Sequence, residues 1–172
     1  MLAPLLVDIS DEFDISVAAA GQLAAATFAA WAISVISVGP ISDSFGRRPV
    51  AVAGLGLLGI SVLASSLAPN FGVLLALRVV TGLSGGMIPP NSMAAVSDVL
   101  TPARRAQAFG RLMAVASLSG VIGVPLVALM ASGGGWRVPF LVIGSLLLIS
   151  STLHWLWYPK IQRSGVQNFS FI

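Results

Sequence analysis

The chain has 172 residues, of which 56% are hydrophobic and only 9% are charged. Soluble domains have about 25% charged residues, so this chain has too little charge to cover a globule with polar surface, and its main solvent must be lipid. It has no cysteine and a single histidine, His154. This composition excludes disulfides, thiolate metal sites and a histidine metal cluster, and nothing in it implies a cofactor.

Membrane-spanning helices are predicted from the lengths of the apolar stretches, because about 20 apolar residues in a helix cross a bilayer. The sequence Ala-Pro-Asn-Phe-Gly at 68–72 divides one long uncharged stretch into two helices. Three consecutive glycines at 133–135 end another span. We therefore expect an all-α helical bundle in the membrane. Its spans are predicted at 17–38, 50–67, 71–97, 112–132 and 138–158, followed by a short cytoplasmic tail at 161–172.

The ends of these spans carry residues typical of helix termini and of membrane interfaces. Ser16, Asn70 and Thr101 stand where capping side chains are expected. Trp136 lies at one end of the last span and Trp155 at the other. Tryptophan favours the two interfaces of a membrane, although ordinary packing inside the protein would explain these residues as well.

The charged residues are divided between the two sides of the predicted bundle. Seven of the nine basic residues fall on one side: Arg47, Arg48, Arg104, Arg105, Arg111, Lys160 and Arg163. Four of the six acids fall on the other side: Asp8, Asp11, Glu12 and Asp14. Basic residues crowd on the cytoplasmic side of membrane proteins, so the first side is predicted to be cytoplasmic. The basic pI then reflects topology, and we expect no nucleic-acid partner.

Both ends of the chain are abrupt. Residues 1–7 are apolar but too few to cross a bilayer, and they look like the last turns of a helix whose beginning is missing. The segment after the last span is short and of mixed composition. We therefore expect the chain to be a fragment of a larger membrane protein.

The most specific segment is the connection between the first two spans, residues 39–49. Gly46 permits an unusual backbone angle, and Pro49 suits the first turn of the next helix. Asp43 lies near a helix C-terminus, where the helix dipole disfavours an acid. We therefore expect it to have a partner, such as Arg47 or the N-terminus of another helix. The alternative is a solvated hairpin loop whose charges serve only topology.

This connection resembles the signature loop of the major facilitator superfamily, which reads Gly-x-x-x-Asp-x-x-Gly-Arg-Arg. The matching residues are Gly39, Asp43, Gly46, Arg47 and Arg48. Ser44 departs from the pattern, since the family often has a basic residue there. The resemblance implies that the loop latches two six-helix halves together on the cytoplasmic side. It also implies that Asp98, at the cytoplasmic end of another span, pairs with Arg47.

Arg78 is a charged residue inside a predicted span, which is costly and indicates a functional site by default. At 100° per residue, four small or short residues fall within about 40° of it on the helix. They are Gly82, Gly85, Pro89 and Ser92. This stripe suits close contact between helices or the lining of a cavity. The alternative is an arginine whose long side chain reaches the membrane surface.

Two further segments resemble motifs of the same family. Arg78 and the glycines after it resemble a motif linked to proton coupling in exporters, although Thr81 stands where glutamine is common. Gly120, Gly123 and Pro125 predict a kink, which serves either as a hinge or only as packing. The sequences at 123–126 and 135–140 resemble the drug and sugar efflux branch. The full antiporter motif is missing, because residues 127 and 128 are not glycines.

Two other patterns point to enzymes. The glycines at 54, 56 and 59 match a dinucleotide fingerprint, but they lie inside an apolar span without a preceding strand, so helix packing is expected. Ser84 and His154 resemble the serine–histidine dyad of intramembrane rhomboid proteases. A dyad needs the base within hydrogen-bond reach of the hydroxyl, and no set of oxyanion donors is evident. We keep this as a remote alternative and expect no enzyme.

Taken over nearly the whole chain, the resemblance implies the N-terminal half of a transporter, from the end of helix 1 through helices 2–6. The implied function is secondary transport of a small organic solute, by proton-coupled efflux across a bacterial inner membrane. Candidate cavity residues are Gln22, Arg78 and Asn91. The expected partners are the lipid bilayer, a small-molecule substrate, and the missing C-terminal half or a second copy. The alternative is a membrane fragment that does not transport.

Overall fold

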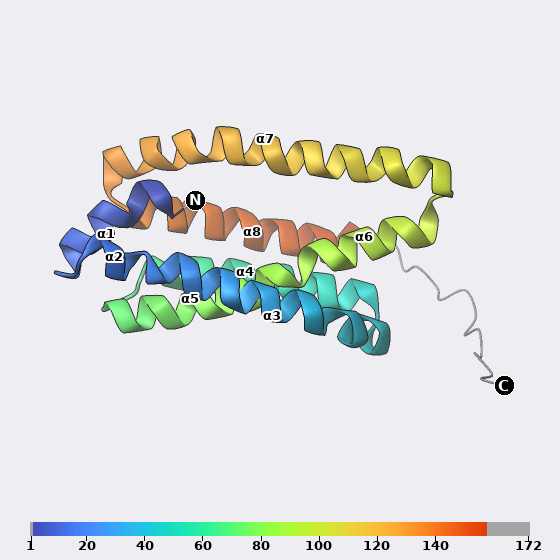
Figure 1. Ribbon diagram of the computed structural model, residues 1–172, viewed down its shortest axis with the longest axis horizontal. Helices are drawn as coiled ribbons and strands as arrows, with labels where there is room; N and C mark the ends of the chain where they lie inside the picture. Colours follow the sequence, from blue (N-terminus) through green and yellow to red (C-terminus); the bar gives the residue numbers. More distant parts are fainter. Residues whose placement is uncertain (1, 158–172) are drawn as a thin grey trace.

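The computed structural model describes residues 2–157, without the side chains of residues 98, 99 and 103, and its elements are all helices (Figure 1). The tail predicted at 161–172 lies outside the described residues. The elements are the 3-10 helix η1 (Ala3–Leu5) and the α-helices α1 (Leu6–Glu12), α2 (Val17–Ala20), α3 (Gln22–Phe45), α4 (Arg47–Ser65), α5 (Phe71–Gly86), α6 (Ile88–Val99), α7 (Pro102–Gly134) and α8 (Arg137–Trp157).

Within the described residues, five helical segments are long and apolar enough to cross a membrane, which confirms the all-α helical bundle. They are Val17–Phe45, Arg47–Ser65, Phe71–Ser97, Arg104–Gly134 and Arg137–Trp157. The third of these joins α5 and α6, which are separated at Met87. Pro89 and Pro90 follow directly and lack the backbone N–H groups that would continue the α5 hydrogen-bond ladder.

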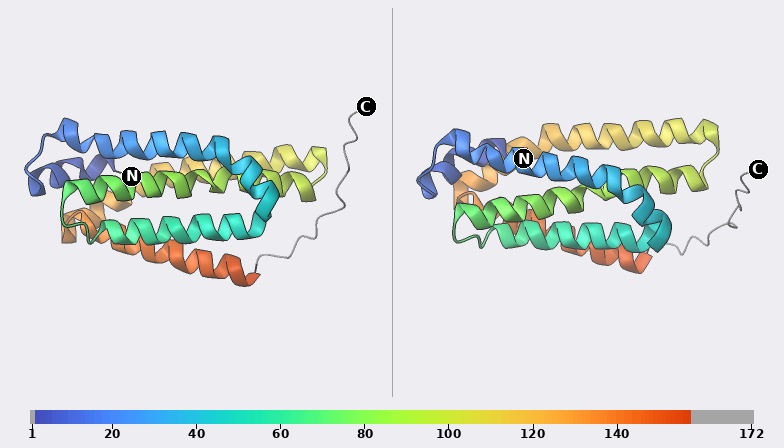
Figure 2. Two further views of the ribbon diagram at one scale, coloured as in Figure 1. Left: turned by 90° about the horizontal axis from the view of Figure 1, so that it is seen from below. Right: turned by 60° about the horizontal axis from the view of Figure 1, so that its bottom comes forward.

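Helix α3 is longer than the predicted first span, because it runs on through Pro40 to Phe45 instead of ending near residue 38. The helix changes direction in this last part (Figure 2), where Pro40 removes one backbone donor. Most of the expected loop is therefore helical. Only Gly46 separates α3 from α4, with a φ of 93° that glycine adopts without strain. The unusual backbone angle expected of Gly46 is confirmed.

The predicted capping residues all stand at helix starts. The side chain of Ser16 accepts a hydrogen bond from the backbone N–H of Ala19, and Asn70 accepts one from Val73. These bonds satisfy donors that a helix start otherwise leaves unpaired. Thr101 is the N-cap residue of α7, but its side chain makes no capping hydrogen bond.

Helices α3 and α5 pack closely through glycines on α5. A Cβ atom at Gly82 would lie 2.2 Å from the backbone oxygen of Thr27, and one at Gly86 would lie 2.7 Å from that of Trp31. Side chains at these positions would force the helices apart. The small residues on α5 therefore permit the backbone approach that is typical of helix pairs in membranes.

Helices α4 and α8 form a second close pair, with one glycine on each helix. A Cβ at Gly59 would lie 2.8 Å from the side chain of Leu148, and one at Gly144 would lie 2.7 Å from the backbone nitrogen of Leu63. Gly54, the first glycine of the fingerprint-like run, faces Met87 at 3.2 Å. The helix-packing interpretation of that run is thus confirmed.

The 3-10 helix η1 packs against α7, and α1 follows directly after it. Leu5 and Ile9 are buried in the same apolar cluster as Val127 and Ala131 of α7. Further along, α7 runs along one side of the bundle (Figure 1), and its residues 111 to 122 are exposed. These exposed residues are mostly apolar, as expected for a helix surrounded by lipid.

The turns of the bundle gather at two ends (Figure 1). The α3–α4 and α6–α7 turns lie at one end, which we call the basic end because it holds Arg47, Arg48, Arg104 and Arg105. Helix α1, the α4–α5 turn and the α7–α8 turn lie at the other, which we call the acidic end after the acids of α1 and the residues following it. The division of charge expected from the sequence is present in the fold.

Candidate functional site

The side chain of Arg78 is enclosed by three helices. It is 4% exposed, and its Nη2 donates a hydrogen bond of 2.5 Å to Ser65 Oγ on α4. Its guanidinium carbon lies 4.9 Å from the centroid of the Phe140 ring on α8, a cation–π contact. The alternative interpretation required the side chain of Arg78 to reach the membrane surface. Arg78 instead stays inside the bundle.

The positive charge of Arg78 is incompletely satisfied. Its Nε is buried and has no hydrogen-bond partner, and no acid pairs with it among the residues that the structure describes. An unpaired charge and an unsatisfied donor inside a membrane bundle are both costly. The arrangement is suited to receiving an anionic group, which would supply the missing charge and accept the free N–H.

A short ladder of hydroxyl groups continues from Arg78 between α4 and α5. Ser65 Oγ donates to the backbone oxygen of Ser61, and Ser61 Oγ lies 3.0 Å from Thr81 Oγ1. Thr81, which replaces the glutamine of the resembling motif, also donates to the backbone oxygen of Leu77. Here its hydroxyl serves contact between two helices of this bundle.

The small-residue stripe beside Arg78 is divided in its role. Gly82 makes the very close approach to α3 described above, so the helix-contact interpretation holds for it. Gly85 makes only ordinary van der Waals contacts, at 3.8 Å from Leu58 and Trp31. The closest further approach is instead made by Gly86, which the helical projection did not select because it lies about 80° from Arg78.

Asn91 connects the two helices on either side of the Gly46 turn. It is buried on α6, where its Oδ1 accepts a hydrogen bond of 2.7 Å from Ser42 Oγ. Its Nδ2 donates a hydrogen bond of 2.7 Å to the backbone oxygen of Arg47. One amide thus holds the end of α3 and the start of α4, a role that sequence reasoning missed because the partners lie more than 40 residues away.

The turn between α3 and α4, which we call the signature turn, holds the charged residues of the predicted signature loop. Asp43 lies in the last turn of α3, and Arg47 is the first residue of α4. Asp98 belongs to α6, but its side chain is outside the described part of the structure. The predicted cluster of Asp43, Arg47 and Asp98 therefore stays a prediction. No atom approaches a Cβ built at Gly39 within 4 Å.

Arg48 binds to the far end of α8. Its Nη2 donates a hydrogen bond to the backbone oxygen of Trp155, and its guanidinium carbon lies 5.3 Å from the indole ring. Its Nε is buried without a partner. This second arginine of the signature turn therefore ties the start of α4 to the end of α8.

The other candidate cavity residues are not brought together with Arg78. Gln22 is exposed at the start of α3, at the acidic end. Asn91 lies 13 residues beyond Arg78, or roughly 20 Å along a helix axis.

The predicted kink residues Gly120, Gly123 and Pro125 lie within α7, which is a continuous helix from Pro102 to Gly134 (Figure 1).

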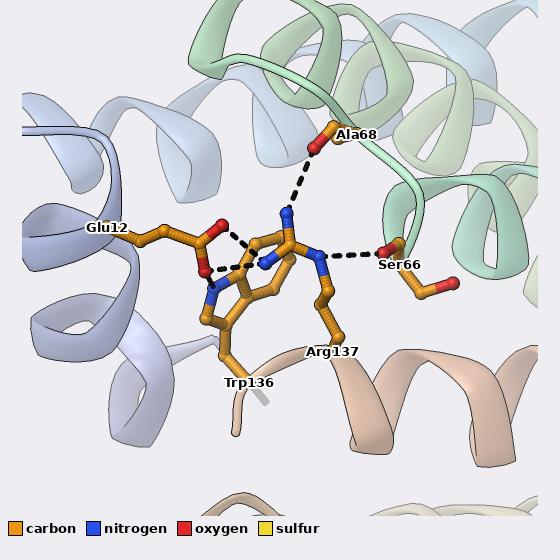
Figure 3. Close-up of polar contacts among 5 residues, drawn as sticks. All are labelled: Glu12, Ser66, Ala68, Trp136 and Arg137. Carbon is orange, nitrogen blue, oxygen red and sulfur yellow. Dashed lines mark hydrogen bonds and ion pairs between the residues drawn. The ribbon is translucent and has the colours of Figure 1, made fainter. Parts of the chain in front are cut away.

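The acidic end holds a polar cluster that the sequence did not predict, which we call the outer clamp: Glu12, Trp136 and Arg137 (Figure 3). Arg137 Nη1 donates to both carboxylate oxygens of Glu12, and Trp136 Nε1 donates to Glu12 Oε2 at 2.6 Å. Arg137 also donates to the backbone oxygens of Ser66 and Ala68, at 3.0 and 3.2 Å. The outer clamp therefore joins α1, the α4–α5 turn and α8.

The outer clamp changes how two of its members are understood. Trp136 is only 3% exposed and packs against Phe13 and Phe140, so it is a packing residue and not part of an interface belt. The pKa of Glu12 is lowered, mainly by the hydrogen bonds from Arg137, although partial burial acts in the opposite direction. The sequence features that could have predicted the outer clamp are the acids of α1 and the adjacent residues Trp136 and Arg137.

The geometry gives no support to a serine–histidine dyad. Ser84 is buried, and its hydroxyl donates to the backbone oxygen of Val80 in its own helix. His154 is exposed on α8, with Nδ1 3.1 Å from the backbone oxygen of Ser150. These contacts hold each side chain to its own helix.

The fold and these sites define a multi-pass α-helical membrane protein. Its buried Arg78 and the arginine Arg48 at the start of α4 both contact residues of other spans. A sequence model of the Major Facilitator Superfamily matches residues 1–169. The chain therefore belongs to this family of membrane transporters, as the signature turn predicted.

Similar proteins are found in bacteria and fungi. The chain is 28% identical over 157 residues to the inner membrane transport protein YnfM of Escherichia coli, covering 91% of this chain and 38% of that protein. It is 28% identical to the uncharacterized MFS-type transporter YceJ of Bacillus subtilis, covering 87% of this chain and 38% of that protein. It is 31% identical to the multidrug transporter mfsC of Aspergillus fumigatus, covering 80% of this chain and 26% of that protein.

The chain thus spans between about a quarter and two fifths of the length of these relatives. The match to the family, over residues 1–169, includes Asp43, Arg47, Arg78 and the outer clamp.

Proposed function

We propose that this chain forms part of a secondary transporter that exports a small organic solute in exchange for protons, in a bacterial inner membrane. Membership of the Major Facilitator Superfamily supports transport. One similar protein is named as a multidrug transporter and another as an inner membrane transport protein, which supports an organic solute and that location.

The observation that carries the proposal is the incompletely satisfied charge of Arg78. A buried guanidinium without an acidic partner in the described residues destabilises the bundle. Such a charge inside a membrane protein usually marks a functional site. We assign to it the binding of two anionic groups in turn during transport, one on the solute and one on an acid whose protonation changes. Competition between that acid and the solute for Arg78 would then couple solute export to proton exchange.

The proposal also includes a partner for this bundle. In transporters of this kind, the solute site lies between two sets of helices that rock against each other. The five spans described here would then need a second half or a second copy of the chain. The charges of Asp43, Arg47 and Asp98 at the basic end would form the latch between the two.

The alternative is a membrane fragment that does not transport. Reconstitution of the purified chain in liposomes separates these cases, with flux of a panel of organic solutes measured with and without a pH gradient. Crosslinking in parallel reports whether the chain is a monomer or a dimer. We expect no flux from the monomer, and gradient-driven flux when a second half or copy is present.

Arg78→Lys tests the assigned residue, because lysine keeps the charge but loses the flat guanidinium and its Nε donor. Arg104→Lys is the matched control at an exposed position. We expect flux to be lost in the first variant and kept in the second. Flux driven by the gradient from a demonstrated monomer would overturn the need for a partner, and equal flux in both variants would overturn the role of Arg78.

A further inference from the structure

A continuous line of direct contacts leads from Arg78 to Glu12 at the acidic end. The Arg78 guanidinium lies 4.9 Å from the Phe140 centroid. The Phe140 ring meets that of Trp136 edge to face, with centroids 5.7 Å apart. Trp136 Nε1 donates a hydrogen bond of 2.6 Å to Glu12 Oε2. Three contacts therefore separate a charge inside the bundle from a carboxylate at its end.

The members of this line that lie inside the bundle have little room to move independently. Arg78, Trp136 and Phe140 are 4%, 3% and 6% exposed. Arg137 lies 4.4 Å over the Trp136 ring, and the Phe13 ring packs 5.9 Å from it. Because protein interiors are close-packed, a change in the position of the indole must be taken up by the rings that touch it.

Phe140 helps to orient Arg78 because the polar contacts of the guanidinium leave it only partly fixed. Within residues 2–157, its side chain donates a hydrogen bond to Ser65, while its Nε has no partner. The flat guanidinium is therefore held by one hydrogen bond on one side and by an aromatic ring on another. Displacement of that ring removes the contact that sets how the Nε donor is aimed.

We propose that Glu12 is a positioning residue for Arg78 and acts on it through Trp136 and Phe140. Separation of α1 from the start of α8 then reorients a buried charge on α5. The part that Arg78 plays in transport rests on the proposed function above. The positional link between the outer clamp and Arg78 requires no partner half. It is therefore tested without any measurement of transport.

The test is an NMR measurement on the purified chain in detergent micelles, with nitrogen-15 arginine as the probe. The Hε signal of Arg78 is assigned by its loss in Arg78→Lys. We expect the ring of Phe140 to shift this signal, because it lies 4.9 Å from the guanidinium carbon. Phe140→Leu is expected to shift it most. Glu12→Gln is expected to shift it in the same direction, because the neutral side chain no longer holds Arg137 and Trp136 together.

The matched control is Asp11→Asn, which removes a negative charge from the same short helix at an exposed position. It is expected to leave the Arg78 signal in place. If Glu12→Gln does not fold, Glu12→Asp provides the same test, since it keeps the charge but withdraws the carboxylate from the indole. An equal displacement of the Arg104 signal would indicate a general change and would overturn the specific link.

The route is tested by combining variants. Trp136→Phe removes the indole N–H donor, so Glu12 loses its hydrogen bond to the ring stack. If Glu12 acts through Trp136, then Glu12→Gln should shift the Arg78 signal much less in that background than in the unmodified chain. An undiminished effect of Glu12→Gln in the Trp136→Phe background, or no effect in the unmodified chain, overturns the proposal.

Discussion

A Cβ atom at Gly82 on α5 would lie 2.2 Å from the backbone oxygen of Thr27 on α3. A Cβ atom essentially never lies this close to a non-bonded atom, and the backbone cannot yield as a flexible side chain does. The packing of α3 on α5 therefore requires glycine at this position.

We expect Gly82→Ala to destabilise the bundle by about 1–3 kcal/mol, the usual cost of overpacking. Gly120→Ala is the matched control in α7, where nothing lies within 4 Å of the added atom. Alanine is favoured over glycine in helices by roughly 0.5–1 kcal/mol, so the control should be neutral or stabilising. Thermal unfolding in detergent compares the two, and equal stability of both variants would contradict the close packing.

Asn91 is expected to stabilise the joint between α3 and α4. Asn91→Leu leaves the buried Ser42 hydroxyl and the Arg47 backbone oxygen without this partner. An unsatisfied buried polar group costs about 1–3 kcal/mol, so the free energy of unfolding should fall by that order. Ser37→Ala is the control, because it removes an exposed hydroxyl bonded within its own helix. Unchanged stability of Asn91→Leu would contradict the bridge.

The outer clamp predicts how stability depends on pH. The folded-state pKa of Glu12 lies below its ordinary value of 4.5, chiefly because of the hydrogen bonds from Arg137. The resulting stability is fully present above the unfolded-state pKa and is lost as pH falls through the folded-state pKa. Glu12→Gln should therefore weaken the decline of stability on the acid side of pH 4.5.

The effect is expected to be small, because Glu12 is 40% exposed and solvent screens the pair. Thermal unfolding at several pH values below and above this range measures it. Asp11→Asn, on the same helix, should leave more of the decline in place. An identical pH profile for Glu12→Gln and the unmodified chain would contradict the stabilising role of the clamp.

The orientation of the bundle is predicted from the charge at its basic end. The chain has no cysteine, so single cysteines report one position each. Ser44→Cys, at an exposed site beside the α3–α4 turn, should resist a membrane-impermeant thiol reagent in intact cells. Leu67→Cys, 76% exposed at the acidic end, should react readily. The reverse pattern would place the basic end outside.

The sequence alone was sufficient to predict the five spans, the caps at Ser16 and Asn70, and the glycine turn at Gly46. Each of these depends on residues near one another in the chain: a run of apolar side chains, a side chain beside a helix start, or one backbone angle. The first span was predicted to end near residue 38, from the length of its apolar stretch, and the helix is longer. Here α3 continues through Pro40 and bends.

Only the tertiary structure decided which side chains meet. Glu12 and Trp136 are 124 residues apart, yet they share a hydrogen bond. The same holds for Asn91, a candidate cavity residue that joins Ser42 to the start of α4. Helical periodicity places a residue on a face of its own helix, but it does not say which helix lies against that face. That choice is made by close packing between spans, as at Gly82.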